Sequence, residues 1–135
     1  MTLLTWSHEC IVGVRAMDDQ HSILMEALNE LRHMLVQGRE RREISEQMER
    51  LVEFTQLHFT CEEQLLEQQG YPGVAEHRAD HKRLFHQIKG TLEHAKHCDD
   101  LEIQSLLQFL RGWYMEHIEG PDKQYGPWLN DRGVF

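Results

Sequence analysis

The sequence contains few cysteines, and their number is odd. Three cysteines among 135 residues are too few for a disulfide framework. The motifs C-x-x-C and C-x-x-C-H are also missing, which excludes the usual signatures of iron–sulfur clusters and c-type haem. We therefore expect a reducing, cytoplasmic compartment.

Basic residues are scarce relative to acidic ones. Asp and Glu outnumber Lys and Arg by 23 to 14, so the formal net charge is -9. This charge argues against nucleic acid and against an anionic membrane surface, because both attract a basic face, and it favours a monomer. No apolar run approaches the roughly 20 residues that cross a bilayer. Without such a run we expect no membrane insertion. Residues 1–9 lack the basic region that precedes the apolar stretch of a signal peptide, so we expect no signal peptide.

Signals for β-strands are nearly absent, whereas four segments repeat apolar residues at spacings of three and four. The first expected helix starts at Asp18 or Asp19, either of which can cap it, and ends before Gly38. The other three helices are expected at about residues 43–69, 74–96 and 101–118. The segment 98–100 is predicted to be a turn and an N-cap.

Gly120 and Pro121 are expected to break or bend the last helix. Helices of this length with short turns predict an all-α fold, namely an antiparallel up-down-up-down four-helix bundle with N- and C-terminal arms. We expect residues 1–135 to form one such domain.

Histidine is abundant, with ten residues in the chain. The helical period places at least one histidine on the inward stripe of each helix, and Glu62 lies four residues after one of them. In an antiparallel bundle these positions converge on one end: His21, His58, His77, His81 and His117. Four other histidines point away from the interior and are expected to be solvated, namely His33, His86, His94 and His97. His8 lies in the N-terminal arm and has no expected position.

Ordinary core packing explains such a cluster poorly, because buried polar rings without partners are costly. Zinc takes at most four protein ligands, and H-E-x-x-H is absent. A weak zinc site at His94 and His97 beside Cys98 is an alternative, although these residues are expected at the surface. Five histidines instead suit two metal ions, which need anionic bridges between them.

Glu62 is on the correct face to bridge two ions, whereas Glu63 lies about 100° further round and is expected to be solvated. A second carboxylate should come from near His117. Asp122 is about 140° off that face in a straight helix, but a bend at Gly120 or a wider π-like turn would bring it back. The spacing favours Asp122 over Glu116 and Glu119, which point elsewhere.

The expected ligands allow a coordination count. We assume three histidines on one ion and two on the other, with two carboxylates and one oxo or hydroxo group bridging the ions. The first ion is then six-coordinate, and the second is five-coordinate with an open position. Nitrogen and oxygen donors without thiolate suit iron or manganese. An open position beside a redox pair is where dioxygen could bind.

Several motifs together resemble the hemerythrin family in its bacterial single-domain form. The first motif is Trp6 with residues 12–14, and the next two are residues 17–21 and residues 58–63. The last two are Tyr71-Pro72 with His77 and His81, and His117-Ile118 with Asp122 and Tyr125. The resemblance implies two iron ions (Fe2+/Fe3+) with a bridging oxo or hydroxo group. It also implies a ligand set with one ion on His77, His81 and His117, the other on His21 and His58, and bridges from Glu62 and Asp122. Tyr114 departs from the leucine that the family often has.

The resemblance further implies reversible dioxygen binding for transport, storage or delivery rather than an enzyme, with an oxygen-consuming enzyme or a reductase as candidate partner. Alternatives are a di-iron oxidase or peroxidase, a nitric oxide-reactive enzyme, and an oxygen or redox sensor. Carboxylate-rich oxidases use paired E-x-x-H motifs, and this chain has one such spacing, Glu30 to His33. Reversible dioxygen binding needs a dry, apolar pocket. The candidates to line this pocket are Leu24, Leu28, Phe59, Leu110, Trp113 and Tyr114.

Overall fold

The computed structural model describes residues 11–135, a stretch of helices without strands. Residues 1–10, which hold most of the expected N-terminal arm and His8, lie outside the described residues. The described elements are α1 (Arg15–Val36), α2 (Arg41–Gln68), α3 (Val74–Ala95), α4 (Asp100–His117), the π-helical turn η2 (Ile118–Asp122) and α5 (Lys123–Asn130).

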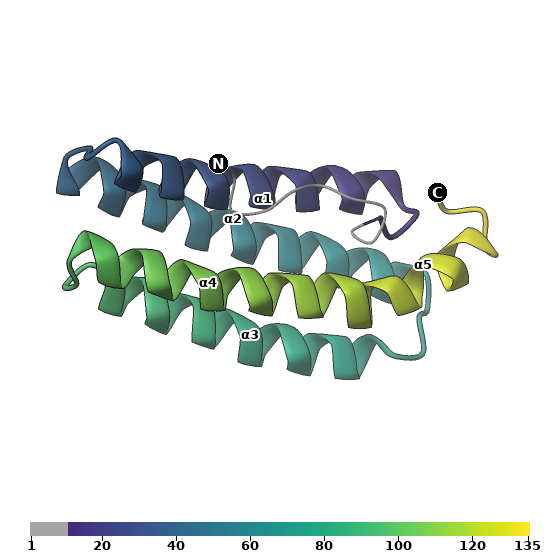
Figure 1. Ribbon diagram of the computed structural model, residues 1–135. Coiled ribbons are helices and arrows are strands. Elements are labelled where there is room, and N and C mark those ends of the chain that lie inside the picture. Colours follow the sequence, from purple (N-terminus) through teal and green to yellow (C-terminus); the bar gives the residue numbers. More distant parts are fainter. Residues whose placement is uncertain (1–10) are drawn as a thin grey trace.

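The four long helices form the expected antiparallel bundle (Figure 1). Helix α1 packs against α2 and α4, and α3 packs against the same two helices. The starts of α1 and α3 and the ends of α2 and α4 therefore share one end of the bundle, where α5 also lies (Figure 1). Leucine, isoleucine and methionine side chains from all four helices fill the interior, and each contributes about 1.5–3 kcal/mol when fully buried.

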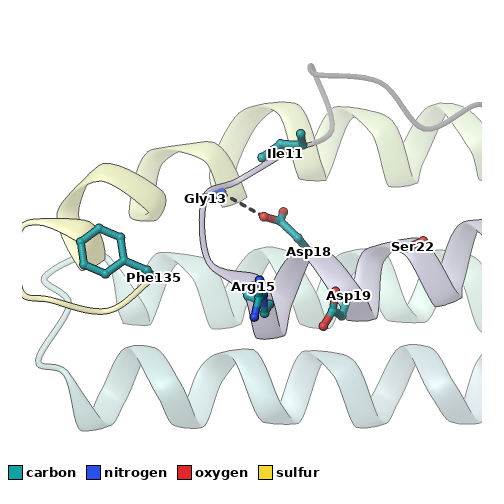
Figure 2. A pocket seen from close by; sticks show the side chains of 7 residues that line it. All are labelled: Ile11, Gly13, Arg15, Asp18, Asp19, Ser22 and Phe135. Carbon is teal, nitrogen blue, oxygen red and sulfur yellow. Dashed lines mark hydrogen bonds between the residues drawn. The ribbon is translucent and has the colours of Figure 1, made fainter.

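The start of α1 differs from the prediction. The helix begins at Arg15, and neither Asp18 nor Asp19 caps it. Asp18 lies in the first turn, where its carboxylate accepts a hydrogen bond from the N–H group of Val12 at 2.8 Å. It accepts another from the N–H group of Gly13 at 3.1 Å, which Figure 2 shows. A surface hollow of about 640 Å³ lies beside this connection. The carboxylate thus folds the preceding segment back along α1.

The start of α4 agrees with the prediction of a turn and an N-cap. Asp99 accepts a hydrogen bond from the backbone N–H of Glu102, and the Glu102 side chain accepts one from the N–H of Asp99. This reciprocal pair is a capping box, which satisfies two backbone donors at the helix start.

The last helix bends at Gly120 and Pro121 but does not end there. The chain passes through the π-turn η2 and continues as α5, so the C-terminal arm is helical. Gly126 lets α5 lie close to the N-terminal segment, because a Cβ atom there would be 2.1 Å from the carbonyl oxygen of Val12. Asn130 also donates a hydrogen bond to the carbonyl of Gly13 at 3.0 Å. These contacts dock α5 across the end of the bundle.

No helix among residues 11–135 is both long enough and apolar enough to cross a membrane.

Candidate metal centre

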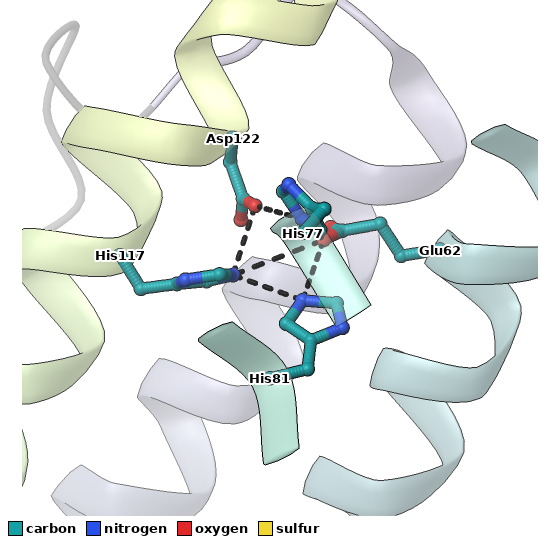
Figure 3. A group of neighbouring side chains, drawn as sticks. All are labelled: Glu62, His77, His81, His117 and Asp122. Atoms are coloured by element: carbon teal, nitrogen blue, oxygen red, sulfur yellow. Dashed lines mark hydrogen bonds and ion pairs between the residues drawn. The ribbon is translucent and has the colours of Figure 1, made fainter. Parts of the chain in front are cut away.

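The structure brings together all seven residues that the sequence analysis proposed as ligands. Each is at most 5% exposed, and Glu62, His21 and Asp122 are fully buried. They come from α1, α2, α3, α4 and η2, and their side chains point toward one another; Figure 3 shows five of them. The seven are His21, His58, Glu62, His77, His81, His117 and Asp122.

These donors fall into two overlapping groups. The three-histidine group contains His77, His81 and His117, and the two-histidine group contains His21 and His58. Glu62 and Asp122 belong to both groups, and within each group the donor atoms lie within 4.8 Å of one another. The division matches the coordination count made from the sequence.

Each shared carboxylate turns one oxygen to each group. Oε1 of Glu62 lies 2.9 Å from Nε2 of His81, while its Oε2 lies 3.3 Å from Nε2 of His58. Asp122 behaves in the same way, with Oδ1 3.0 Å from Nε2 of His117 and Oδ2 3.0 Å from Nε2 of His21. A carboxylate that presents one oxygen to each of two sites is suited to bridge two cations.

Asp122 reaches the site through the π-turn. In a straight α-helix, five residues after His117 correspond to about 140° away from the histidine face. The wider turn of η2 carries Asp122 back to the interior, where it is 0% exposed. Of the two possibilities in the sequence analysis, a bend or a π-like turn, the π-turn accounts for the position of Asp122, and turns of this kind recur at functional sites.

The outer nitrogens of three histidines also have partners. Nδ1 of His81 bonds to Glu63 at 2.9 Å, and Nδ1 of His117 bonds to Asp80 at 2.9 Å. Nδ1 of His58 bonds to the amide oxygen of Gln20 at 2.6 Å.

The sequence analysis gave two of these partners no role at the site, and it misplaced the third. Glu63 was expected to be solvated, and this was wrong: it is half-buried and spans the gap to α3. Asp80 and Gln20 were missed. Each immediately precedes a predicted ligand in the chain, and that adjacency is the one signal that could have marked them.

The protein groups alone leave buried polar atoms without partners, and this tests whether the site suits a cation. Among residues 11–135, neither carboxylate oxygen of Asp122 makes a hydrogen bond, although an imidazole nitrogen lies 3.0 Å from each, and Nε2 of His21 and of His58 makes none either. Nε2 of His81 and Nε2 of His117 lie 3.0 Å apart. Because the Nδ1–H groups of both rings face carboxylates, two lone pairs would meet there. A proton or a metal ion resolves these conflicts, so the residues suit a metal.

Protonation states point the same way. At His58, burial is the largest effect and lowers the pKa. Burial acts in the same direction on His21, His77 and His117, but there the two shared carboxylates outweigh it. They raise the pKa of His21 and of His77 to about 9, and that of His117 to about 11. Burial disfavours ionised carboxylates, yet the surrounding histidines hold the pKa values of Glu62 and Asp122 below their ordinary range. Glu62 and Asp122 are therefore two buried anions, and nearby positive charge stabilises them.

Helix α5 closes the outer end of the site. The fully buried Tyr125 donates its hydroxyl hydrogen to Oε2 of Glu62 at 2.9 Å. Burial and the nearby carboxylates of Glu62 and Asp122 raise the pKa of Tyr125 well above its ordinary value. The phenol therefore stays protonated and remains a donor to the shared carboxylate.

A buried layer lies one helical turn inside the histidines, toward the middle of the bundle. Its members follow or precede a histidine by three residues, namely Leu24, Thr55, Leu84 and Tyr114. Its two hydroxyls bond to each other at 2.7 Å, and Thr55 donates to the carbonyl of Leu51 at 2.7 Å. Since the Thr55 hydrogen is used there, Tyr114 donates to Thr55. Neither hydroxyl hydrogen is left free.

The histidines expected at the surface are there: His33, His86, His94 and His97 are all exposed. The Glu30 and His33 spacing lies on an exposed face of α1. Among residues 11–135, His94, His97 and Cys98 do not form a group that could hold a metal ion. The described donors thus converge at the bundle end alone.

Known proteins are similar to this chain in sequence and in fold. Residues 12–129 match the family model described as the hemerythrin HHE cation binding domain. A bacteriohemerythrin from Methylococcus capsulatus is 33% identical over 132 residues, covering 96% of this chain and 99% of its own length. One from Pseudomonas aeruginosa is 31% identical over 93% of this chain and 80% of its own length.

Solved structures agree. A crystal structure of wild-type hemerythrin superposes with a TM-score of 0.80 at 30% identity, covering 93% of this chain and 96% of that one. A leucine-to-tyrosine variant of hemerythrin superposes with a TM-score of 0.81 at 32% identity, covering 94% and 97%. With a family model that spans nearly the whole described chain, and relatives matched almost end to end, the chain belongs to the hemerythrin family.

Proposed function

We propose that the protein binds dioxygen reversibly at a non-haem di-iron centre. One iron is held by the three-histidine group and the other by the two-histidine group. The single observation that carries this proposal is the pair of shared carboxylates, Glu62 and Asp122, each with one oxygen toward each group. The proposed ligands are His21, His58, Glu62, His77, His81, His117 and Asp122.

The donor set supports iron. All seven donors are imidazole nitrogens or carboxylate oxygens, a set that suits iron or manganese. Membership of the hemerythrin family favours iron between these two. A bridging oxo or hydroxo group completes the proposed centre.

The unequal groups assign the place of the exogenous ligand. The two-histidine group offers one protein donor fewer than the three-histidine group, so dioxygen enters beside His21 and His58. When bound, a pair of iron ions supplies two electrons to dioxygen and recovers them on release.

The chain supports reversibility by excluding water from both sides of the centre. On the inner side, Leu24 and Tyr114 belong to a layer of buried side chains, and Phe59 stacks on His81 with ring centroids 3.9 Å apart. On the outer side, α5 covers the site with Tyr125. Trp113 does not belong to this closed surface, because it is only half-buried.

The same layer favours binding over oxidation. Release of dioxygen as such requires that protons do not reach it, and Tyr114 and Thr55 have already committed their hydroxyl hydrogens to each other and to a carbonyl. The histidine-rich donor set also carries less negative charge than the paired E-x-x-H sets of oxidases. We therefore propose a carrier, for transport, storage or delivery, rather than an enzyme. An oxygen-consuming enzyme or a reductase is the proposed partner, and the carrier is proposed to act as a monomer.

An anaerobic optical titration tests this function. The protein is reduced, its iron is quantified, and air is admitted and then removed. Two irons per chain and a visible band that appears and disappears reversibly are expected. His58→Ala is the matched variant, because it removes a donor from the two-histidine group and should abolish the reversible band.

Other outcomes contradict the proposal. Two irons with rapid irreversible oxidation would favour an oxidase or a redox sensor, and peroxide and nitric oxide would be assayed next. Zinc in place of iron, or fewer than two ions per chain, would overturn the assignment of the ligands.

A further inference from the structure

The outer nitrogens of the histidines meet different chemistry in the two halves of the site. In the three-histidine group, His81 and His117 each face a carboxylate, from Glu63 and Asp80 respectively. In the two-histidine group, His58 faces the neutral amide of Gln20, and Nδ1 of His21 has no hydrogen-bond partner among residues 11–135. Within the described part of the chain, one half thus has two anionic partners on its outer nitrogens, and the other has none.

Both carboxylates are themselves held by arginines on their solvent side. Nε of Arg78 lies 3.4 Å from Glu63, and Arg83 forms an ion pair with Asp80. Two chains of contacts therefore lead from the surface to the inner cluster. One runs from Arg78 through Glu63 to His81, and the other runs from Arg83 through Asp80 to His117. The arginines are 42% and 72% exposed and remain accessible to water, while the carboxylates beneath them are only 24% and 22% exposed.

A carboxylate bonded to the Nδ1–H group of an imidazole has two effects on the opposite nitrogen. It fixes the tautomer and the ring orientation, so that the Nε2 lone pair points inward, and it makes that nitrogen a stronger electron donor. A neutral amide oxygen fixes the ring but adds less electron density, because charge-assisted hydrogen bonds are roughly twice as strong as neutral ones.

We propose that Glu63 and Asp80 are positioning residues that make the three-histidine half the more strongly donating half of the centre. This inference rests on the proposed function. The three-histidine half then binds its ion first and holds the higher positive charge more readily. The half next to Gln20 binds its ion more weakly and accepts an electron first. The exogenous ligand and the first electron therefore both go to the two-histidine half of the centre.

A metal titration separates this proposal from a purely structural role. Apo-protein is titrated with Co2+ alone, whose visible spectrum reports each binding step. Wild-type protein is expected to bind two ions with unequal affinity. Glu63→Gln and Asp80→Asn keep an oxygen acceptor and remove only the charge, so each should weaken the tighter site about tenfold and leave the weaker site within about twofold. The double variant should weaken the tighter site about a hundredfold.

Two further variants sharpen the test. Gln20→Glu should tighten the weaker site by about tenfold, because it supplies the charge that this half lacks. Glu67→Gln is the matched control: Glu67 pairs with the same Arg78, is 63% exposed, and makes no hydrogen bond or ion pair with a ligand histidine within residues 11–135. It should leave both binding constants unchanged.

Iron-loaded protein supplies a second readout. The midpoint potential of the last iron to be reduced should rise in Glu63→Gln and Asp80→Asn, and that of the first should fall in Gln20→Glu. A structural role would instead lower thermal stability without shifting either potential. Equal weakening of both Co2+ sites, or wild-type behaviour of both charge-removing variants, overturns the inference and leaves the di-iron proposal standing. Uptake of fewer than two ions by the wild-type chain overturns both.

Discussion

The hydroxyl oxygen of Tyr114 lies 2.7 Å from Oγ1 of Thr55, and both side chains are buried one turn inside the metal centre. The family often has leucine where this chain has Tyr114. The pairing explains how a phenol is accommodated there, because a buried hydroxyl without a partner costs about 1–3 kcal/mol. Burial also raises the pKa of Tyr114, so the phenol stays protonated at physiological pH.

Thr55→Val tests the importance of this pair. The change keeps the shape of the side chain but leaves the Tyr114 hydroxyl without its acceptor, so we expect a loss of about 1–3 kcal/mol in the free energy of unfolding. An uncommitted O–H group in a closed pocket is also a proton donor, so iron-loaded protein should autoxidise faster. Urea unfolding and the decay of the oxygenated band measure the two effects. Adding Tyr114→Phe should reverse both, and unchanged autoxidation in Thr55→Val would remove the proposed protective role.

Tyr125→Phe is expected to weaken metal binding more than it weakens folding. The variant keeps the ring and removes only the hydrogen bond to Glu62, the carboxylate shared by both groups. Loss of such a supporting bond typically costs 10–100-fold in metal affinity. Competition with a chelator measures the affinity. Tyr71→Phe is the control, since the ring of Tyr71 contacts that of Tyr125 edge-on and is only partly buried; equal effects of the two variants would contradict the prediction.

Gly126→Ala should destabilise the protein by about 1–3 kcal/mol, because the added Cβ would overlap the carbonyl of Val12 at 2.1 Å and force the backbone apart. Since α5 carries Tyr125, metal affinity should fall as well. Gly112→Ala in α4 is the matched control, because nothing lies within 4 Å of its added Cβ. There the change should stabilise the helix by up to about 1 kcal/mol. Thermal unfolding of both variants measures the two changes in stability, and equal effects of Gly126→Ala and Gly112→Ala would contradict the prediction.

The pH dependence of stability should change sign when metal binds. In apo-protein, the pKa values of His21 and His77 are about 9, above the unfolded value of 6.5, so the folded state binds more protons between these limits. Stability from these groups is complete below pH 6.5 and is lost as the pH rises through about 9. For His21 alone this amounts to on the order of 3 kcal/mol.

Metal-loaded protein should behave in the opposite way. Coordinated Nε2 atoms cannot hold protons, whereas the unfolded chain binds them below pH 6.5, so stability should rise with pH up to about 6.5 and then level off. Urea unfolding at several pH values, with and without metal, measures both profiles. Parallel profiles would show that the histidines do not bind the ion.

The bundle and the inward histidines could be predicted from local pattern. Helical periodicity assigns each residue a direction from its own axis, and short turns impose antiparallel neighbours. Together these put His21, His58, His77 and His117 at one end of the fold, as the structure has them. The start of α1 was misjudged because Asp18 satisfies the N–H groups of an irregular segment and not those of the helix.

The partners of the histidines could not be predicted in this way. Glu63 points about 100° from Glu62, which on an isolated helix means solvent, yet its side chain reaches His81 on the neighbouring helix. That contact depends on the separation and axial offset of two helices, which periodicity within one helix does not contain.

The all-α fold, the faces of its helices and the candidate metal-binding residues follow from the amino-acid sequence, because they depend on the period of the α-helix and the chemistry of side chains. How the donors are shared depends on tertiary packing. It placed Asp122 through a π-turn, docked Tyr125 on Glu62, and gave carboxylate partners to one group of histidines and an amide to the other. These relationships join residues from different helices, so they depend on packing distances that no single segment specifies.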